Sequence, residues 1–435
     1  MLASGALFYF LSIAAHRRSG NGMKKKTYRE TYTNLRALYD PHAAMIQLPG
    51  TDIEIHHCAF TSSSWTVLPG AHTYSCTEHG LVFHEDLESG LREQLQSYPE
   101  TLKHGDIDIQ ENKHFTYALF KKTSVSRAPG VILLFHGLNE HTWDKYLPWA
   151  EKLVELSGKA VILFPIAFHM NRTPMEWGKS RSMNTVSEIR HRRSPAIMNS
   201  CFANAAISAR IELIPQRFFW SGFQTFDDVI RLSAEIKNGL HAFIAPDATI
   251  DLFSYSIGSF LSEILMMANP GNYFQNSKSF MFCGGPTLDR MTPNSKFILD
   301  SDATIAIYKF YSERLETELQ LDSRMAHYFN GAHPAGIVFK MLLSYQKHKA
   351  AREQRFRDLQ NQLKAIALKQ DDVIPANEVL NTLKGDYRDI ATPVEVMDFP
   401  FPYSHINPFP THELYEQMVD ASFNEIFTKA AAHLQ

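Results

Sequence analysis

The sequence predicts an α/β fold, in which helices cover both faces of a mostly parallel central sheet. Short, continuous apolar runs recur along the chain, as they do in strands that are buried on both faces of a parallel sheet. Segments with helical spacing alternate with these runs, and this alternation is typical of parallel strands joined by crossover helices. The composition allows a large core, because 44% of the 435 residues are hydrophobic and only 20% are charged.

The predicted strands follow one another from residue 107 onwards. IDIQ at 107–110 and the alternating HFTYALFKK at 114–122 predict an antiparallel pair. Residues 149–156 have helical spacing. Buried strands are predicted for VILLF (131–135), AVILFP (160–165), TIDLFSYS (249–256), SFMFCGG (279–285), LKAIAL (363–368) and PVEVMDF (393–399).

The rest of the chain divides around these strands. Residues 23–106 are interpreted as an N-terminal extension and residues 107–435 as the main domain, with long insertions at about 170–238 and about 286–362. Both insertions have helical patterns with aromatic stripes, which are more often core than cofactor sites. We expect them to form cap helices that shelter a site. Four arginines in the first insertion are interpreted as a solvated basic loop rather than as a site for an acidic substrate: Arg181, Arg190, Arg192 and Arg193.

The first 22 residues are ambiguous. The apolar run at 2–15 is shorter than the about 20 residues of a membrane span. Its positive charges follow the run, whereas a secretory signal carries them before it. Met23 is an alternative start, so residues 1–22 are either an over-extended reading frame or a weak apolar leader, and no stable membrane span is expected.

Charge and cysteine content exclude several classes of protein. With 43 basic and 46 acidic residues the net charge is −3, so nucleic acid is not an expected partner. Four cysteines without a C-x-x-C pair do not make a disulfide framework, and we interpret them as reduced, which fits a cytoplasmic location. The oligomeric state is left open.

Histidines and cysteines gather in the N-terminal segment. These residue types bind zinc, but their spacing matches no familiar zinc finger. Surface histidines are the favoured interpretation, and no metal or cofactor is expected. The residues concerned are His56, His57, Cys58, His72, Cys76 and His79.

The segment SYSIG, from Ser254 to Gly258, has the pattern of a nucleophilic serine on a sharp turn. An apolar strand precedes it, and apolar residues at helical spacing follow it. Such a strand–turn–helix holds a serine clear of its own backbone and beside the N-terminus of a helix, where partial positive charge favours an oxyanion. Small residues, here Ser254 and Gly258, are needed where strand and helix approach. Ser256 is the predicted nucleophile, and a helix-capping serine is the alternative.

HGLNE, at 136–140, follows the first buried strand and predicts the other half of an oxyanion site. Gly137 allows the chain to turn back, so that the Leu138 N–H points inward beside the Ile257 N–H. His136 is expected to shape this loop rather than to take part in chemistry.

Two later segments supply candidates for a base and an acid. KQDDVIP, at 369–375, places Asp371 and Asp372 after the fifth buried strand, where one carboxylate could orient a histidine. PYSHINP, at 402–408, places His405 in a loop braced by prolines after the last strand. His412 is the rival base. Position and the Ser–Asp–His order favour His405.

The chain resembles the alpha/beta-hydrolase superfamily over about residues 107–435. The resemblance rests on four motifs in this order: HG, S-x-S-x-G, D-D-V-I-P and a late histidine. SYSIGSFLSEILMMANP and ANAAISARIELIPQRFFWSGFQTFDDVIRL suggest an uncharacterised bacterial branch of serine esterase- or lipase-like hydrolases. The resemblance implies Asp371 as the acid, four residues before Pro375. The chain departs from the family at Ser254, where a glycine is usual, and this predicts tighter packing at the turn.

The resemblance implies a serine hydrolase that cleaves a carboxylic ester or related acyl bond of a small-molecule substrate through an acyl-enzyme, without a cofactor. A peptidase or amidase with the same residues is one alternative. A non-catalytic binding protein on the same scaffold is the other, because a fold does not guarantee activity.

Overall fold

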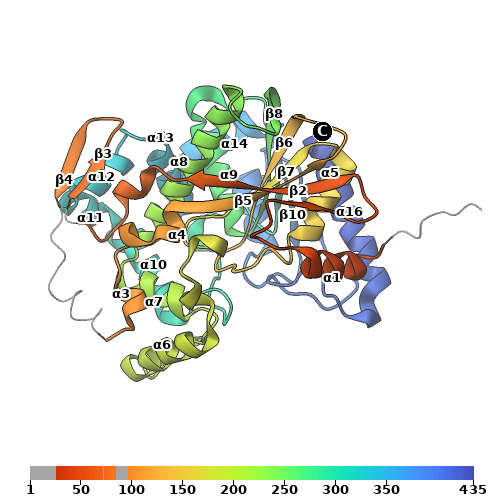
Figure 1. Ribbon diagram of the computed structural model, residues 1–435. Helices are drawn as coiled ribbons and strands as arrows, with labels where there is room; N and C mark the ends of the chain where they lie inside the picture. The colour runs from red at the N-terminus through yellow and green to blue at the C-terminus, as the bar shows by residue number, and fades with distance from the viewer. Residues whose placement is uncertain (1–25, 72, 85–96) are drawn as a thin grey trace, which may run out of the picture.

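The computed structural model describes residues 26–71, 73–84 and 97–435. Residues 1–22, the alternative start at Met23 and His72 therefore lie outside the described residues. A nine-stranded sheet crosses the molecule (Figure 1). In spatial order its strands are β1 (Met45–Gln47), β2 (Ile53–Thr61), β5 (His114–Lys122), β7 (Ala160–Leu163), β6 (Ala128–Phe135), β8 (Ile244–Tyr255), β9 (Ser279–Phe282), β10 (Leu363–Leu368) and β11 (Val394–Met397).

The sheet is mostly parallel. Strands β7, β6, β8, β9, β10 and β11 pair in parallel, whereas β1, β2 and β5 are antiparallel to their neighbours. Each predicted buried strand is present, and the predicted fold class is confirmed. A separate two-stranded sheet joins β3 (Thr73–Cys76) to β4 (Leu81–His84).

Alternating side chains of the central strands fill two separate cores. In β6, Val131 and Leu133 pack into one cluster, and Ile132 and Leu134 pack into the other. This is the period-2 alternation of a strand covered on both faces, and it explains why β6 is apolar without interruption.

Helices cover both faces of the sheet. On one face lie α1 (Tyr28–Leu38), α5 (Leu147–Ser157) and α16 (Glu416–Leu434). On the other lie α8 (Arg217–Lys237), α9 (Ile257–Ala268), α13 (Pro334–Leu343) and α14 (Lys349–Leu359). The remaining helices are α3 (Glu100–Lys103), α4 (Gln110–Lys113), α6 (Ser180–Arg193), α7 (Ala205–Leu213), α10 (Ser301–Tyr308), α11 (Leu315–Leu321), α12 (Ser323–Phe329) and α15 (Ala376–Lys384).

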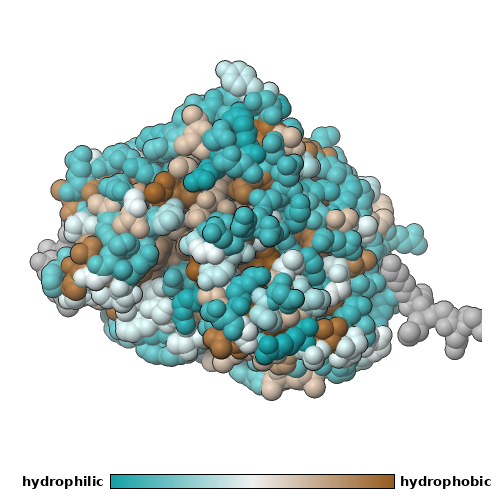
Figure 2. Space-filling view, turned by 90° about the horizontal axis from the view of Figure 1, so that it is seen from above, coloured by the Kyte–Doolittle hydropathy of each residue, from teal (hydrophilic) through white to brown (hydrophobic). Residues whose placement is uncertain are grey.

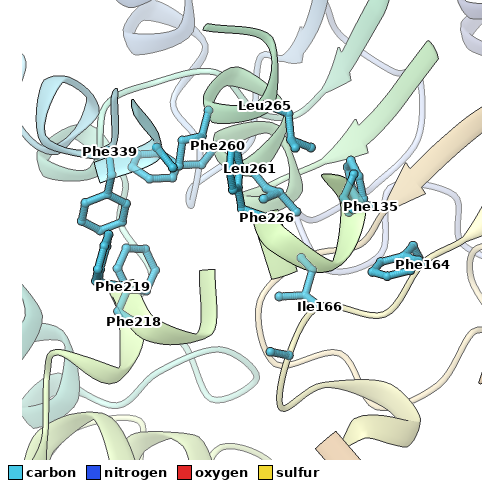
Figure 3. Packing of buried hydrophobic residues seen from close by; sticks show 14 of the residues in the cluster. Phe135, Phe164, Ile166, Phe218, Phe219, Phe226, Phe260, Leu261, Leu265 and Phe339 are labelled. Carbon is cyan, nitrogen blue, oxygen red and sulfur yellow. The ribbon is translucent and has the colours of Figure 1, made fainter. Parts of the chain in front are cut away.

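Helix α9 is the most enclosed of these elements. Aromatic side chains from both predicted insertions pack against it (Figure 3). Phe260 of α9 lies 6.2 Å from Phe218 of α8 and 5.7 Å from Phe339 of α13, measured between ring centroids. The same helix buries a carboxyl group, because Glu263 is only 1% exposed. Burial raises the pKa of Glu263 well above its usual value, against a smaller opposing effect of Arg352.

The antiparallel partner of β5 is not the one predicted. Residues 107–110 form no strand, because Asp106–Asp108 make a 3₁₀ turn that leads into α4. The buried Asp106 carboxylate pairs with Arg210 at 2.9 Å and with Arg217 at 3.0 Å, and these contacts hold the segment against α7 and α8. Tertiary contacts of this kind outweigh local alternation. The partner of β5 is β2, so part of the predicted N-terminal extension belongs to the central sheet.

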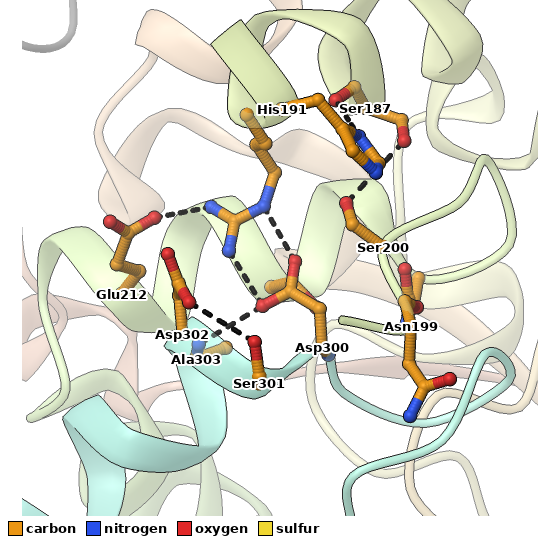
Figure 4. A network of polar contacts seen from close by, with 12 residues as sticks. Ser187, His191, Asn199, Ser200, Glu212, Asp300, Ser301, Asp302 and Ala303 are labelled. Carbon is orange, nitrogen blue, oxygen red and sulfur yellow. Dashed lines mark hydrogen bonds and ion pairs between the residues drawn. The ribbon is translucent and has the colours of Figure 1, made fainter. Parts of the chain in front are cut away.

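The prediction of a solvated basic loop is wrong for Arg190. Its guanidinium is buried in α6 and donates two hydrogen bonds to Asp300, of 2.6 and 2.7 Å. It also pairs with Glu212, and Figure 4 shows Asp300 and Glu212 in this network. Asp300 in turn caps α10 by accepting a 3.0 Å bond from Ala303 N–H. Arg190 therefore joins helices of the two insertions, whereas its neighbour Arg192 is exposed.

The surface seen from above is mostly hydrophilic, with hydrophobic residues scattered over it (Figure 2). Among the described residues, no helix combines the length and the apolar character that a membrane crossing needs.

We predict that Arg190→Met lowers the free energy of unfolding by about 3–5 kcal/mol, because it leaves Asp300 buried without its ionic partner. Arg192→Met is the control and should change it by no more than about 0.5 kcal/mol. Urea unfolding of the two variants measures the difference. Equal stability of both would show that the buried pair is not needed.

Candidate active site

The turn at Ser256 has unusual backbone geometry. Strand β8 ends at Tyr255 and α9 begins at Ile257, so Ser256 alone makes the turn, with φ 56° and ψ −125°. A positive φ is strained for a residue with a side chain, and such strain persists only where the surroundings enforce it.

The end of β6 enforces this geometry. A Cβ atom on Gly258 would lie 2.7 Å from the Phe135 carbonyl oxygen and 2.9 Å from that of His136, so only glycine fits there. Ser254, which replaces the usual glycine on the other side of the turn, is buried, and its hydroxyl donates a 3.2 Å hydrogen bond to Ser259 Oγ. This bond satisfies the buried hydroxyl group that the serine adds.

Three of the predicted site residues form a hydrogen-bonded chain. Ser256 Oγ lies 2.8 Å from His405 Nε2, and His405 Nδ1 lies 2.7 Å from Asp371 Oδ2. With the proton on Nδ1, the imidazole donates to the carboxylate and accepts from the hydroxyl. All three residues are buried, between 4% and 6% exposed, so the chain is shielded from bulk water.

Backbone N–H groups fix the Asp371 carboxylate. Its Oδ1 accepts hydrogen bonds from Val373 N–H at 2.9 Å and from Ile374 N–H at 2.8 Å, which leaves Oδ2 for His405. The neighbouring Asp372 is exposed. The structure thus brings Asp371, and not Asp372, to the histidine.

The rival base lies elsewhere. His412 is exposed and accepts a 3.2 Å hydrogen bond from Leu414 N–H, just before α16.

Tyr255 contacts His405 through both its ring and its hydroxyl group. Its ring stacks on the imidazole, with centroids 5.3 Å apart and planes 21° apart, and its hydroxyl donates to the His405 carbonyl oxygen. Burial raises the pKa of Tyr255 well above its usual value, so the hydroxyl remains a donor. The residue that precedes the predicted nucleophile therefore positions the predicted base.

Both ring nitrogens of His136 are hydrogen-bonded to the backbone. Its Nε2 accepts a 2.9 Å hydrogen bond from Ile166 N–H, and Nδ1 donates to the Gly137 carbonyl oxygen at 2.8 Å. Burial, with a smaller effect of His169, holds the pKa of His136 well below its usual value. A neutral, fully paired imidazole braces the loop.

A polar cluster links this loop to the His405 loop. Gly137 N–H donates to Tyr146 Oη at 3.0 Å, and Tyr146 Oη donates to Glu140 at 3.0 Å. Lys145 pairs with Glu140 and donates a 3.3 Å bond to the carbonyl oxygen of Ile406, next to the histidine.

Asn139 joins the same loop to both insertions. It has a positive φ of 61°, and its side-chain amide donates 2.8 Å hydrogen bonds to the carbonyl oxygens of Ala203 and Phe297. The sequence does not assign roles to Tyr255, Tyr146, Glu140, Lys145 or Asn139. In the sequence these residues are distinguished only by lying in or near the motifs. Their roles depend on partners that are mostly far away in the sequence.

A small apolar cavity opens beside Ser256. Its volume is about 30 Å³. Leu138 and Ile257, whose N–H groups are the predicted oxyanion donors, both line it. The other lining residues come largely from the insertions and from the Asp371 loop: Phe218, Leu288, Met291, Pro293, Ile298, Leu299, Ile307, Val373 and Ile374.

The strand order, together with the serine turn after β8, defines an alpha/beta-hydrolase fold. The chain belongs to a family of unknown function, DUF6051, whose model matches residues 26–435. No curated protein matches it in sequence. The predicted bacterial branch stays a prediction.

Solved structures with similar chain traces include proteins described as esterases and as an alpha-beta-hydrolase. A double mutant of the esterase rPPE is 8% identical, with 94% of this chain and 89% of that chain covered and a TM-score of 0.42. Carboxyl esterase 2 of the mycorrhizal fungus Tuber melanosporum is 12% identical, with 74% and 81% covered and a TM-score of 0.39. A peroxisomal alpha-beta-hydrolase of Saccharomyces cerevisiae is 12% identical, with 87% and 89% covered and a TM-score of 0.38.

We predict that Gly258→Ala lowers the free energy of unfolding by about 1–3 kcal/mol, because its methyl group overlaps the end of β6. Gly222→Ala in α8 is the matched control. A Cβ there meets nothing within 4 Å, so alanine should leave stability unchanged or raise it by up to about 1 kcal/mol. Thermal unfolding compares the two, and a stable Gly258→Ala would contradict the close approach.

Proposed function

We propose that this protein is a serine hydrolase that cleaves a carboxylic ester or a related acyl bond through an acyl-enzyme. The observation that carries the proposal is the buried hydrogen-bonded chain from Ser256 through His405 to Asp371, at a strained turn beside an apolar cavity. A capping serine needs neither a histidine at 2.8 Å nor a carboxylate behind that histidine.

In this mechanism His405 acts first as a base. Its Nε2 takes the proton of Ser256 as Oγ attacks the carbonyl carbon, and later returns it to the leaving alcohol. Asp371 holds the imidazole with its proton on Nδ1 and stabilises the charged form. A water molecule, activated by the same histidine, then attacks the acyl-enzyme and releases the acid.

The N–H groups of Leu138 and Ile257 are the proposed oxyanion donors. Each follows a residue whose geometry is fixed, namely Gly137 in the braced loop and Ser256 in the strained turn. Donors of this kind are each worth about 2.7–4 kcal/mol of transition-state stabilisation. Since they are held before substrate arrives, little reorganisation accompanies the reaction.

The cavity favours a short apolar acyl group. The cavity volume of about 30 Å³ leaves room for only a few non-hydrogen atoms, and the lining side chains are aliphatic and aromatic. Short p-nitrophenyl esters are therefore the assay substrates of choice.

We predict that Ser256→Ala reduces hydrolysis of p-nitrophenyl acetate by several orders of magnitude without unfolding the protein. Roughly 10³–10⁴-fold catalysis over water can remain from binding and the oxyanion donors. A fluorophosphonate probe should add one label to the wild type and none to the variant, by intact mass. Unlabelled and inactive wild type would favour the non-catalytic alternative, and an active Ser256→Ala would refute the assignment.

The two adjacent aspartates give the sharpest test. Asp371→Asn should lower turnover on the order of 10⁴-fold, because the amide cannot hold the histidine tautomer or stabilise its charge. Asp372→Asn is the matched control and should change turnover little, since an exposed carboxylate acts through screened electrostatics. Steady-state kinetics on the same ester measures both. The reverse result would transfer the role to Asp372.

A further inference from the structure

A cluster of one cysteine and three histidines lies away from the serine site. Cys76 ends β3, and His79 follows in the turn to β4. His327 belongs to α12, and His333 is the residue before α13. The small sheet and these two helices lie side by side at the left of Figure 1. Cys76 and His333 are thus in contact although they are 257 residues apart in sequence.

The four side chains direct one ligand atom each towards a common centre. Cys76 Sγ lies 3.3 Å from His79 Nδ1 and 3.3 Å from His333 Nε2, and His333 Nε2 lies 3.2 Å from His327 Nε2. All four atoms lie within 4.8 Å of one another. Tetrahedral zinc, with bonds of about 2.0–2.1 Å to nitrogen and about 2.3 Å to sulfur, places its ligands about 3.3–3.6 Å apart. The three separations of 3.2–3.3 Å are close to this arrangement, and the remaining pairs, all within 4.8 Å, are near enough for small side-chain rotations to complete it.

A carboxylate orients one of these histidines. Glu78 Oε2 lies 3.2 Å from His333 Nδ1, the ring nitrogen that faces away from the cluster. A proton on Nδ1 leaves the lone pair of Nε2 directed at the centre. Histidines that bind zinc commonly have such a carboxylate on their second nitrogen.

We propose that Cys76, His79, His327 and His333 bind a zinc ion that joins the β3–β4 hairpin to α12 and α13, two helices of the second insertion. A thiolate and imidazoles are the ligands zinc prefers, and four protein ligands leave no open position for substrate. The ion is therefore structural.

The proposal differs from the interpretation of these residues as surface histidines. Of the N-terminal histidines and cysteines that the structure describes, Cys76 and His79 belong to the site. His56, His57 and Cys58 lie in β2 of the central sheet. The other two ligands come from the second insertion, so no local spacing reveals the site.

The position of the site gives the ion a mechanical role. His333 directly precedes α13, and Phe339 of that helix packs on Phe260 of α9, the helix that begins beside Ser256. Zinc at His333 would fix the start of α13, so metal binding should stabilise the packing of α13 on α9 as well as the hairpin.

The full-length chain without a purification tag provides the test. As purified it should contain about one zinc per chain by elemental analysis. After removal of the metal with a chelator, Co²⁺ should give the absorption of a tetrahedral thiolate complex. Added Zn²⁺ should raise the thermal midpoint, and at a hundredfold excess of free zinc over its Kd the folding equilibrium shifts about a hundredfold.

Variants within the same hairpin, with one control in β2, make the test specific. Cys76→Ser should abolish the thiolate absorption and weaken zinc binding on the order of 100-fold or more, and Glu78→Gln should weaken it about tenfold with unchanged stoichiometry. Cys58→Ser and the exposed His84→Ala are the controls and should bind zinc as the wild type does. His79→Ala, matched to His84→Ala, should lose the metal.

Three results would overturn the proposal. One is wild-type protein that holds no zinc and shows no midpoint shift when Zn²⁺ is added. Another is a loss of zinc in His84→Ala as large as that in His79→Ala, which would indicate adventitious binding. If Cys76→Ser does not fold, His327→Asn replaces it, because His327 is only partly buried. The third result is a folded His327→Asn that binds zinc with wild-type affinity, which would equally refute the site.

Discussion

The close approach of α9 to the end of β6 is the constraint on which the rest of the site depends. Gly258 lets the helix start against the Phe135 and His136 carbonyl groups, and this contact leaves Ser256 alone to make the turn. Its positive φ follows from that geometry and directs Oγ towards His405. The loop after β6 is part of the same contact, so one packing interaction places both the hydroxyl and the proposed oxyanion donors.

Buried ion pairs, in addition to apolar contacts, hold together segments that are distant in the sequence. Arg190 pairs with Asp300, Arg217 with Asp106, and Arg172 with Asp228, each inside the protein. Burial of such charges is unfavourable unless geometry and hydrogen bonding are satisfied, so each pair tolerates few alternative arrangements. We infer that the pairs restrict how the segments that carry them are oriented.

The strands and the turn at Ser256 could be predicted from the sequence because their signals are local. An apolar run predicts a buried strand, and a small-x-Ser-x-small turn before a helix indicates Ser256. The turn at 106–110 could not be predicted, because its cause is a contact between Asp106 and arginines about a hundred residues later. The same holds for His333 beside Cys76, and for Tyr255, whose partner is a backbone carbonyl in the His405 loop. The choice between Asp371 and Asp372 needed the family resemblance, since neighbouring carboxylates have the same local pattern.

Glu263, on the buried helix behind Ser256, couples folding to proton binding. The unfolded chain ionises this carboxyl above its ordinary pKa of 4.5, whereas the folded protein keeps it neutral because its pKa is raised. Between pH 4.5 and the raised pKa, the folded state therefore binds one more proton than the unfolded state. Its contribution to stability is complete in acid and falls by about 1.4 kcal/mol per pH unit until the raised pKa is reached. A rise in pH from 4.5 towards the raised pKa thus weakens the protein from within the helix that begins beside Ser256.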